Sequence, residues 1–222
     1  MGCSTRRPAP GKGSEPAARE GARRVAGRPL ISWSLQAFAA SESVSGVTIA
    51  APSGEEETLR RLAPGATVVT GGATRAESVA LALATTTSEA VAIHDAARPL
   101  LSAELVDRLA ARLDGSDADC VIAAAPVADT LKREGEVGAV AGTVSRDGLW
   151  GAQTPQLFRV ASLRRAQDAA RERGDLDQAT DEAWLIERAG GTVLLEPTGT
   201  PNLKVTDAAD LAVAEALLAG RG

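Results

Sequence analysis

Apolar residues follow two different spacings along the chain from residue 27 onward. Segments with apolar side chains three or four positions apart predict helices, because that spacing lines one helix face. Short apolar runs between turn residues predict buried strands. The predicted helices are residues 29–40, 55–62, 73–84, 103–113, 161–173, 180–189 and 207–219, and the predicted strands are residues 47–50, 66–70, 91–94, 120–124 and 192–195.

The order of these elements predicts an α/β fold. Helices alternate with strands, which is the pattern of a mostly parallel sheet joined by crossover helices. Such units pack with one hand, so we expect a three-layer sandwich. Ser102 and Thr206 stand where the caps of two helices are expected. Residues 127–150 do not continue this alternation of helices and strands. They contain charged residues, glycines and isolated valines, and they predict a hairpin-like excursion from the sheet.

The first 26 residues do not share this pattern. They contain no apolar run of strand length and are rich in Pro, Gly, Arg and Ala. Composition therefore predicts an irregular segment over residues 1–26, followed by one domain over residues 27–222.

Composition narrows the classes of function. The formal net charge of −5 argues against a nucleic-acid-binding surface, although residues 1–29 hold seven Arg or Lys against two Glu. No apolar stretch is long enough to span a bilayer, so we expect a cytoplasmic protein with no membrane partner. Two cysteines and one histidine indicate neither a disulfide framework nor a His-based metal site, and we expect a single activity.

The candidate chemistry gathers where predicted strands end. The run His94-Asp95-Ala96-Ala97-Arg98-Pro99 follows an apolar strand with an acid, two small residues and a guanidinium. Ligands of open parallel sheets bind beyond the carboxyl ends of the strands, so Asp95 and Arg98 should face a crevice. Further basic and hydroxyl residues, at Arg146, Thr154 and Lys204, favour a pocket for phosphate groups.

Seven motifs then carry a family resemblance. In chain order they are GRPLISWSL, GGATRAESV, HDAARP, PVADTLK, RDGLWGAQTPQLF, TDEAWLIE and NLKVTDAADL. Together they resemble the 2-C-methyl-D-erythritol 4-phosphate cytidylyltransferases of the non-mevalonate isoprenoid pathway. The resemblance implies a nucleotidyltransferase sandwich, CMP transfer from CTP to the polyol phosphate with release of pyrophosphate, and a divalent metal such as Mg²⁺. It also implies a homodimer formed through a projecting β-arm at about residues 127–150.

The resemblance assigns roles to individual residues. Gly71, Gly72 and Ser78 match positions that receive cytosine and ribose, and Ala96 would line the nucleotide. Asp95 matches an acid near substrate and metal, Arg98 its phosphate-facing neighbour, and Lys204 a lysine at the α-phosphate. The positions that hold the methylerythritol phosphate are matched by Thr130, Arg146 and Thr154, the first two on the arm.

The chain departs from the family at its beginning. The family has an apolar strand there, then a glycine-rich loop with an arginine, then a Pro-Lys pair. Gly11 and Gly13 keep the loop spacing and would contact the triphosphate, but Glu15-Pro16 replaces the arginine and no Pro-Lys pair follows. Arg19, Arg23 or Arg24 could supply the missing charge. Besides the main interpretation, two alternatives stay open: a pentitol-phosphate (ribitol 5-phosphate) cytidylyltransferase, and a catalytically impaired nucleotide-binding relative.

Overall fold

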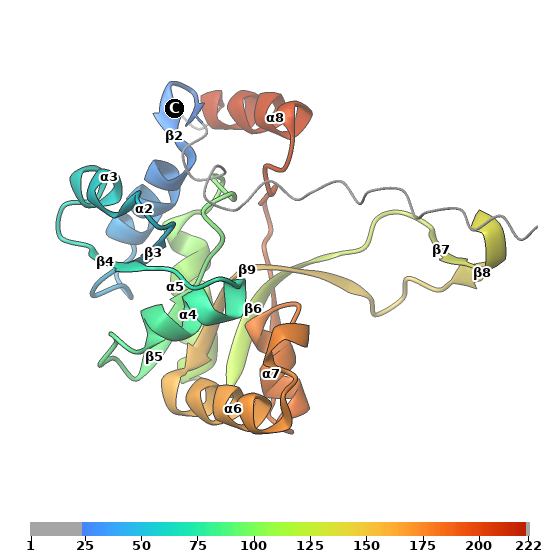
Figure 1. The fold of residues 1–222 in the computed structure, drawn as a ribbon. Helices are drawn as coiled ribbons and strands as arrows, with labels where there is room; N and C mark the ends of the chain where they lie inside the picture. Colours follow the sequence, from blue (N-terminus) through green and yellow to red (C-terminus); the bar gives the residue numbers. More distant parts are fainter. Residues whose placement is uncertain (1–23, 221–222) are drawn as a thin grey trace, which may run out of the picture.

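A computed structural model describes residues 24–220, which form an α/β sandwich with one long projection (Figure 1). The strands are β1 (Arg24–Val25), β2 (Arg28–Pro29), β3 (Thr48–Ala51), β4 (Thr67–Thr70), β5 (Ala90–Ile93), β6 (Cys120–Pro126), β7 (Leu131–Glu134), β8 (Val140–Val144), β9 (Trp150–Arg159) and β10 (Val193–Pro197). The helices are α2 (Leu30–Ala40), α3 (Glu56–Leu62), α4 (Arg75–Leu83), α5 (Ala103–Asp114), α6 (Val160–Arg173), α7 (Glu182–Arg188) and α8 (Ala208–Ala219), with short 3₁₀ turns η1 (Glu136–Gly138) and η2 (Leu176–Gln178).

The central sheet of the described residues has the strand order β10-β6-β9-β5. β10 runs parallel to β6, whereas β9 is antiparallel to both β6 and β5. The expected α/β sandwich is confirmed, but this sheet is mixed, because β9 enters it as a strand that the sequence pattern did not predict. β3 and β4 form a separate parallel pair.

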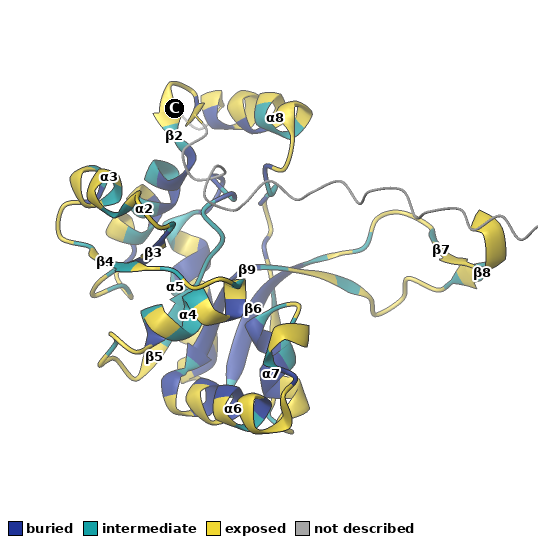
Figure 2. Cartoon of the chain, viewed as in Figure 1, coloured by how far each residue is buried: buried dark blue, intermediate teal, exposed yellow. Residues whose placement is uncertain are grey.

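Both faces of this sheet are buried, which explains the unbroken apolar run of β6. Alternate side chains of a strand point to opposite faces. Cys120 and Ile122 pack with Phe158 against α6 and α7, while Val121 and Ala123 pack against α2 and α5. Figure 2 shows the buried strands between the two helix layers. The sheet is therefore the middle layer of a three-layer sandwich.

The segment between β6 and β9 leaves this body. β7 and β8 pair antiparallel at its far end, with η1 as the connection. Its tip is exposed in Figure 2, and Val137 and Val140 are among the exposed large apolar residues. The hairpin predicted over residues 127–150 is present, and Trp150 already belongs to β9, where it pairs with Pro126.

Most helix boundaries fall within one or two residues of the prediction, and the caps explain the differences. Ser102 caps α5, as expected. The cap of α8 is Asp207 rather than Thr206, because its carboxylate accepts from the N–H groups of Ala209 and Asp210. Thr206 instead donates to Asp210. α7 starts two residues later than expected because Asp181 is its cap.

The structure also bears on the end of the predicted irregular segment. Arg24 and Val25, which the composition placed in it, form β1 and pair with β2. Val25 is buried in a cluster with Leu30 of α2 and residues of α8. Across residues 24–220, no helix has the length and apolar character needed to cross a membrane.

Candidate functional site

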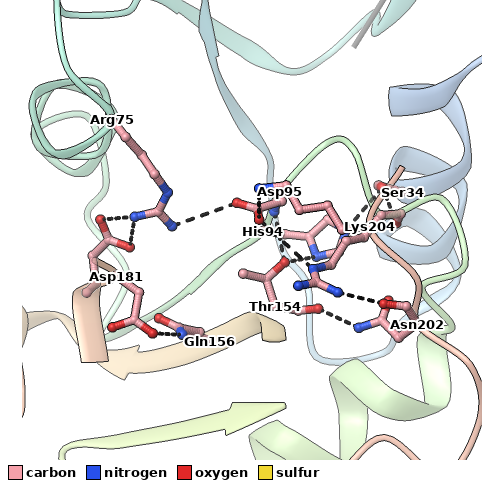
Figure 3. A network of polar contacts seen from close by, with 11 residues as sticks. Ser34, Arg75, His94, Asp95, Thr154, Gln156, Asp181, Asn202 and Lys204 are labelled. Atoms are coloured by element: carbon pink, nitrogen blue, oxygen red, sulfur yellow. Dashed lines mark hydrogen bonds and ion pairs between the residues drawn. The ribbon is translucent and has the colours of Figure 1, made fainter. Parts of the chain in front are cut away.

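Asp95 is the centre of a charged cluster beyond the carboxyl end of β5 (Figure 3). Its carboxylate lies 3.2 Å from Lys204 Nζ, 3.8 Å from Arg75 Nη2 and 4.0 Å from Arg98 Nε. Sequence reasoning placed Asp95, Arg98 and Lys204 together, and the structure brings them together. Three cations around one carboxylate leave a net positive charge, which suits a phosphate-bearing ligand.

The pKa of Asp95 reflects this surrounding charge. Burial alone would raise it, but Lys204 and Arg75 outweigh burial and hold the pKa below the usual value. Asp95 is therefore ionised at neutral pH. It can keep the ammonium and guanidinium groups in place before any ligand binds.

Arg75, from the first turn of α4, is the member of the cluster that the sequence did not single out. Its Nη1 donates to both carboxylate oxygens of Glu182, at 2.7 and 2.6 Å, which leaves Nη2 directed at Asp95. Glu182 is buried, and burial raises its pKa although Arg75 opposes the shift. The signal was a glutamate among the apolar residues of α7, within the TDEAWLIE motif.

Backbone contacts bring the remote Lys204 to this place. The N–H of Val205 donates to the carbonyl of Ala97, at 2.8 Å, so the segment before α8 lies along the loop after β5. Arg98 Nη1 donates to the carbonyl of Asn202, at 2.7 Å. The Nε of Arg98 is buried and has no hydrogen-bond partner among residues 24–220, although the Asp95 carboxylate lies 4.0 Å from it.

His94 connects the cluster to β9. Its Nδ1 lies 3.2 Å from Thr154 Oγ1, and its Nε2 lies 3.1 Å from Ser34 Oγ and 3.2 Å from the carbonyl of Arg98. Burial lowers the pKa of His94 to about 4, so the ring is neutral at pH 7. Thr154, predicted to bind substrate, accepts from the N–H of Asp95 at 3.0 Å. His94 is therefore a packed, hydrogen-bonded residue.

The glycine pair before α4 has a structural reason that the sequence alone did not show. A Cβ on Gly72 would lie 2.3 Å from Glu77 Cβ, and one on Gly71 would lie 2.9 Å from Ser78 Oγ. Glu77 forms a capping box with Thr74, which fixes this close approach. The Ser78 hydroxyl accepts from Gly72 N–H and donates to the Thr74 carbonyl.

The remaining residues that the sequence assigned to the site do not all lie in the Asp95 cluster. Ala96 directly follows Asp95 and packs against the cluster that contains Ile31 and Ile49. Thr130 and Arg146 are exposed on the arm, outside the Asp95 cluster of their own chain, and Arg146 donates to the carbonyl of Ala128. Gly11 and Gly13, like Arg19 and Arg23, lie outside the described residues. Arg24, a candidate for the missing loop charge, binds the carbonyl of Gly27.

No cluster of three or more His, Cys, Asp or Glu that could hold a metal ion occurs within residues 24–220. Asp95 therefore offers a metal one carboxylate. Mg²⁺ is commonly held by one or two carboxylates together with substrate phosphates. A metal ion at Asp95 would therefore need phosphate oxygens of a ligand as further donors.

Comparisons with known proteins agree on one family. A model of the 2-C-methyl-D-erythritol 4-phosphate cytidylyltransferase family matches residues 8–220. The chain is 41% identical over 203 residues to the enzyme of that name from Parasynechococcus marenigrum, covering 89% of this chain and 88% of the relative. It is 43% identical over 208 residues to the one from Dechloromonas aromatica, covering 88% and 87%. The crystal structure of the 2-C-methyl-D-erythritol 4-phosphate cytidylyltransferase from Thermus thermophilus superposes with a TM-score of 0.79 at 36% identity, covering 91% of this chain and 95% of that one.

Proposed function

Because the chain belongs to the 2-C-methyl-D-erythritol 4-phosphate cytidylyltransferase family, we propose that it transfers CMP from CTP to 2-C-methyl-D-erythritol 4-phosphate. The products are 4-diphosphocytidyl-2-C-methyl-D-erythritol and pyrophosphate. The observation that carries the proposal is the cluster of Arg75, Arg98 and Lys204 around Asp95 at a strand end, which suits two phosphate-bearing substrates. The same proposal implies a cytoplasmic location, where CTP is present.

The reaction needs positioning and positive charge rather than a protein nucleophile. A phosphate oxygen of the polyol phosphate attacks the α-phosphorus of CTP, and the bond from that phosphorus to the bridging oxygen breaks as pyrophosphate leaves. Negative charge accumulates on the oxygens around the α-phosphorus. Lys204 and Arg98 are the cations that would bind those oxygens, and their contacts with Asp95 hold both side chains at the site.

A divalent cation fits this proposal through Asp95 and the phosphates of the nucleotide. Bound there, Mg²⁺ would neutralise charge on the triphosphate. The charged side chains around Asp95 would bind the two substrates, one on each side of Asp95. Nucleotide contacts at Gly71, Gly72, Ser78 and Ala96, and acceptor contacts at Thr154, belong to the same proposal.

We further propose that the active unit is a homodimer. Thr130 and Arg146 are carried by the arm, away from the charged cluster of the same chain, so a second copy is needed to bring them to a site. The exposed apolar side chains of Val137 and Val140 near the arm tip support an interface there.

The decisive experiment measures pyrophosphate release from CTP, Mg²⁺ and 2-C-methyl-D-erythritol 4-phosphate. We expect turnover with this acceptor and much slower release with ribitol 5-phosphate. The control is Asp95→Asn, which should fold normally and lose turnover. Faster release with ribitol 5-phosphate would contradict the acceptor. Absence of turnover in a folded, dimeric sample that binds CTP would identify an impaired nucleotide-binding relative.

A further inference from the structure

We propose that His94 is a positioning residue that fixes Thr154 as a hydrogen-bond acceptor toward a hydroxyl group of the polyol phosphate; this inference rests on the proposed function. Thr154 lies on β9 beside Asp95, and its hydroxyl could in principle either donate to a ligand or accept from it (Figure 3). The direction decides which part of an acceptor the residue recognises. A phosphate oxygen only accepts, whereas a polyol hydroxyl can donate.

The contacts of Nε2 determine where the imidazole proton lies. Nε2 is 3.2 Å from the carbonyl oxygen of Arg98, and a carbonyl oxygen can only accept. Ser34, on the same side, is a hydroxyl that can accept from Nε2 as well as donate to the Arg98 carbonyl, at 3.4 Å. The opposite tautomer would place a bare Nε2 lone pair against the carbonyl. The contact with the carbonyl oxygen therefore assigns a ring proton to Nε2.

The proton on Nε2 makes Nδ1 an acceptor. In the 3.2 Å contact between Thr154 Oγ1 and Nδ1, the hydroxyl proton is then the one that is shared. One lone pair of Thr154 Oγ1 already accepts from Asp95 N–H, at 3.0 Å. A hydroxyl has one proton and two lone pairs, so a single lone pair remains for a ligand. In this state Thr154 can bind a hydroxyl donor but offers no proton to a phosphate oxygen.

The surroundings hold this arrangement in place. The carbonyl of Thr154 accepts from Asn202 Nδ2 at 2.8 Å, and the carbonyl of Asn202 accepts from Arg98. The imidazole also packs edge-on against Phe38, with ring centroids 5.6 Å apart. Thr154, His94 and the loop after β5 are thus connected on several sides, and neither side chain can turn without breaking a hydrogen bond.

The tautomer can be measured directly because the chain has one histidine. Untagged protein labelled with ¹⁵N in the imidazole should give a single pair of ring nitrogens in long-range ¹H–¹⁵N correlation spectra at pH 8. We expect the pattern of a neutral ring protonated on Nε2. A ring protonated on Nδ1, or on both nitrogens, would overturn the proposal, because Thr154 would then have a free hydroxyl proton.

A kinetic test separates positioning from plain stability. His94→Gln keeps an amide near the Nε2 position and removes the Nδ1 acceptor, so the Thr154 hydroxyl becomes free to rotate. We expect the KM for the polyol phosphate to rise about tenfold, with the KM for CTP and the melting temperature nearly unchanged. Ser34→Ala is the matched control, since it alters the other side of the same ring and should leave both KM values near wild type.

Thr154→Val provides the coupling measurement. It should raise the same KM in the wild-type background and add little to His94→Gln, because both changes remove one interaction. Equal effects in the two backgrounds, or equal increases in both KM values, would contradict the positioning role. Loss of all turnover in the unaltered chain would count against the proposed function alone, because the NMR measurement needs no activity.

Discussion

At the scale of single residues, the sequence was enough to predict that Asp95, Arg98 and Lys204 belong to the site. Asp95 and Arg98 follow a predicted strand, and strand ends meet at one edge of a sheet. Lys204 was found through its motif. Arg75 and Glu182 were not found, because they are 107 residues apart in the chain and the sequence does not show that the two side chains pair. Their hydrogen bonds exist only after α4 and α7 pack.

The residue with the sharpest kinetic prediction is Lys204. Its Nζ contacts Asp95 at 3.2 Å, and its proposed role grows as charge accumulates at the α-phosphorus. Lys204→Ala should therefore lower kcat by roughly a hundredfold or more and raise the KM for CTP much less. Lys204→Arg, which keeps the charge, should recover part of the rate. A large increase in KM at unchanged kcat would make Lys204 a phosphate anchor only.

At the scale of elements, β9 shows where a periodicity argument fails. Pro155 lies near its middle, after the mixed run Trp150-Gly151-Ala152-Gln153-Thr154, and a proline argues against a central strand. The pairing of β6 with β9 shifts between Ile122 and Ala124, opposite Gln156 and Ala152, so Pro155 lies in an irregular part of the ladder. A missing N–H is tolerated at such a bulge. Helices and apolar strands were predictable because their burial pattern is local, whereas this strand depends on its neighbours.

The loop between β4 and α4 gives the prediction at this scale. Gly72→Ala would place a Cβ 2.3 Å from Glu77 Cβ, so the capping box must distort. We expect a loss of about 1–3 kcal/mol in the free energy of unfolding, measured by urea denaturation. Gly46→Ala is the matched control, because its Cβ would meet nothing within 4 Å. Similar values for the two variants would show that α4 moves freely at this end.

At the scale of the whole molecule, the arm separates residues that the proposed reaction needs together. Arg146 lies on the segment between β8 and β9, while Asp95 lies in the body. The sequence pattern predicted the excursion, and the family resemblance implied a homodimer in which Thr130 and Arg146 of the arm serve the partner's site. A site shared between two copies would bring Arg146 of one chain to Asp95 of the other, since a two-fold dimer gives each body the other's arm.

A mixing experiment tests this arrangement. Asp95→Asn and Arg146→Ala should each be inactive as homodimers, because every site lacks one required group. In a hybrid dimer, one site would combine the intact body of one chain with the intact arm of the other. Random exchange makes half of the dimers hybrid, so mixing should restore about a quarter of the wild-type rate. Mass spectrometry of the mixture would establish that subunits have exchanged. If exchange is complete and the mixture stays inactive, Arg146 serves the site of its own chain, and the arm must bend back to reach Asp95.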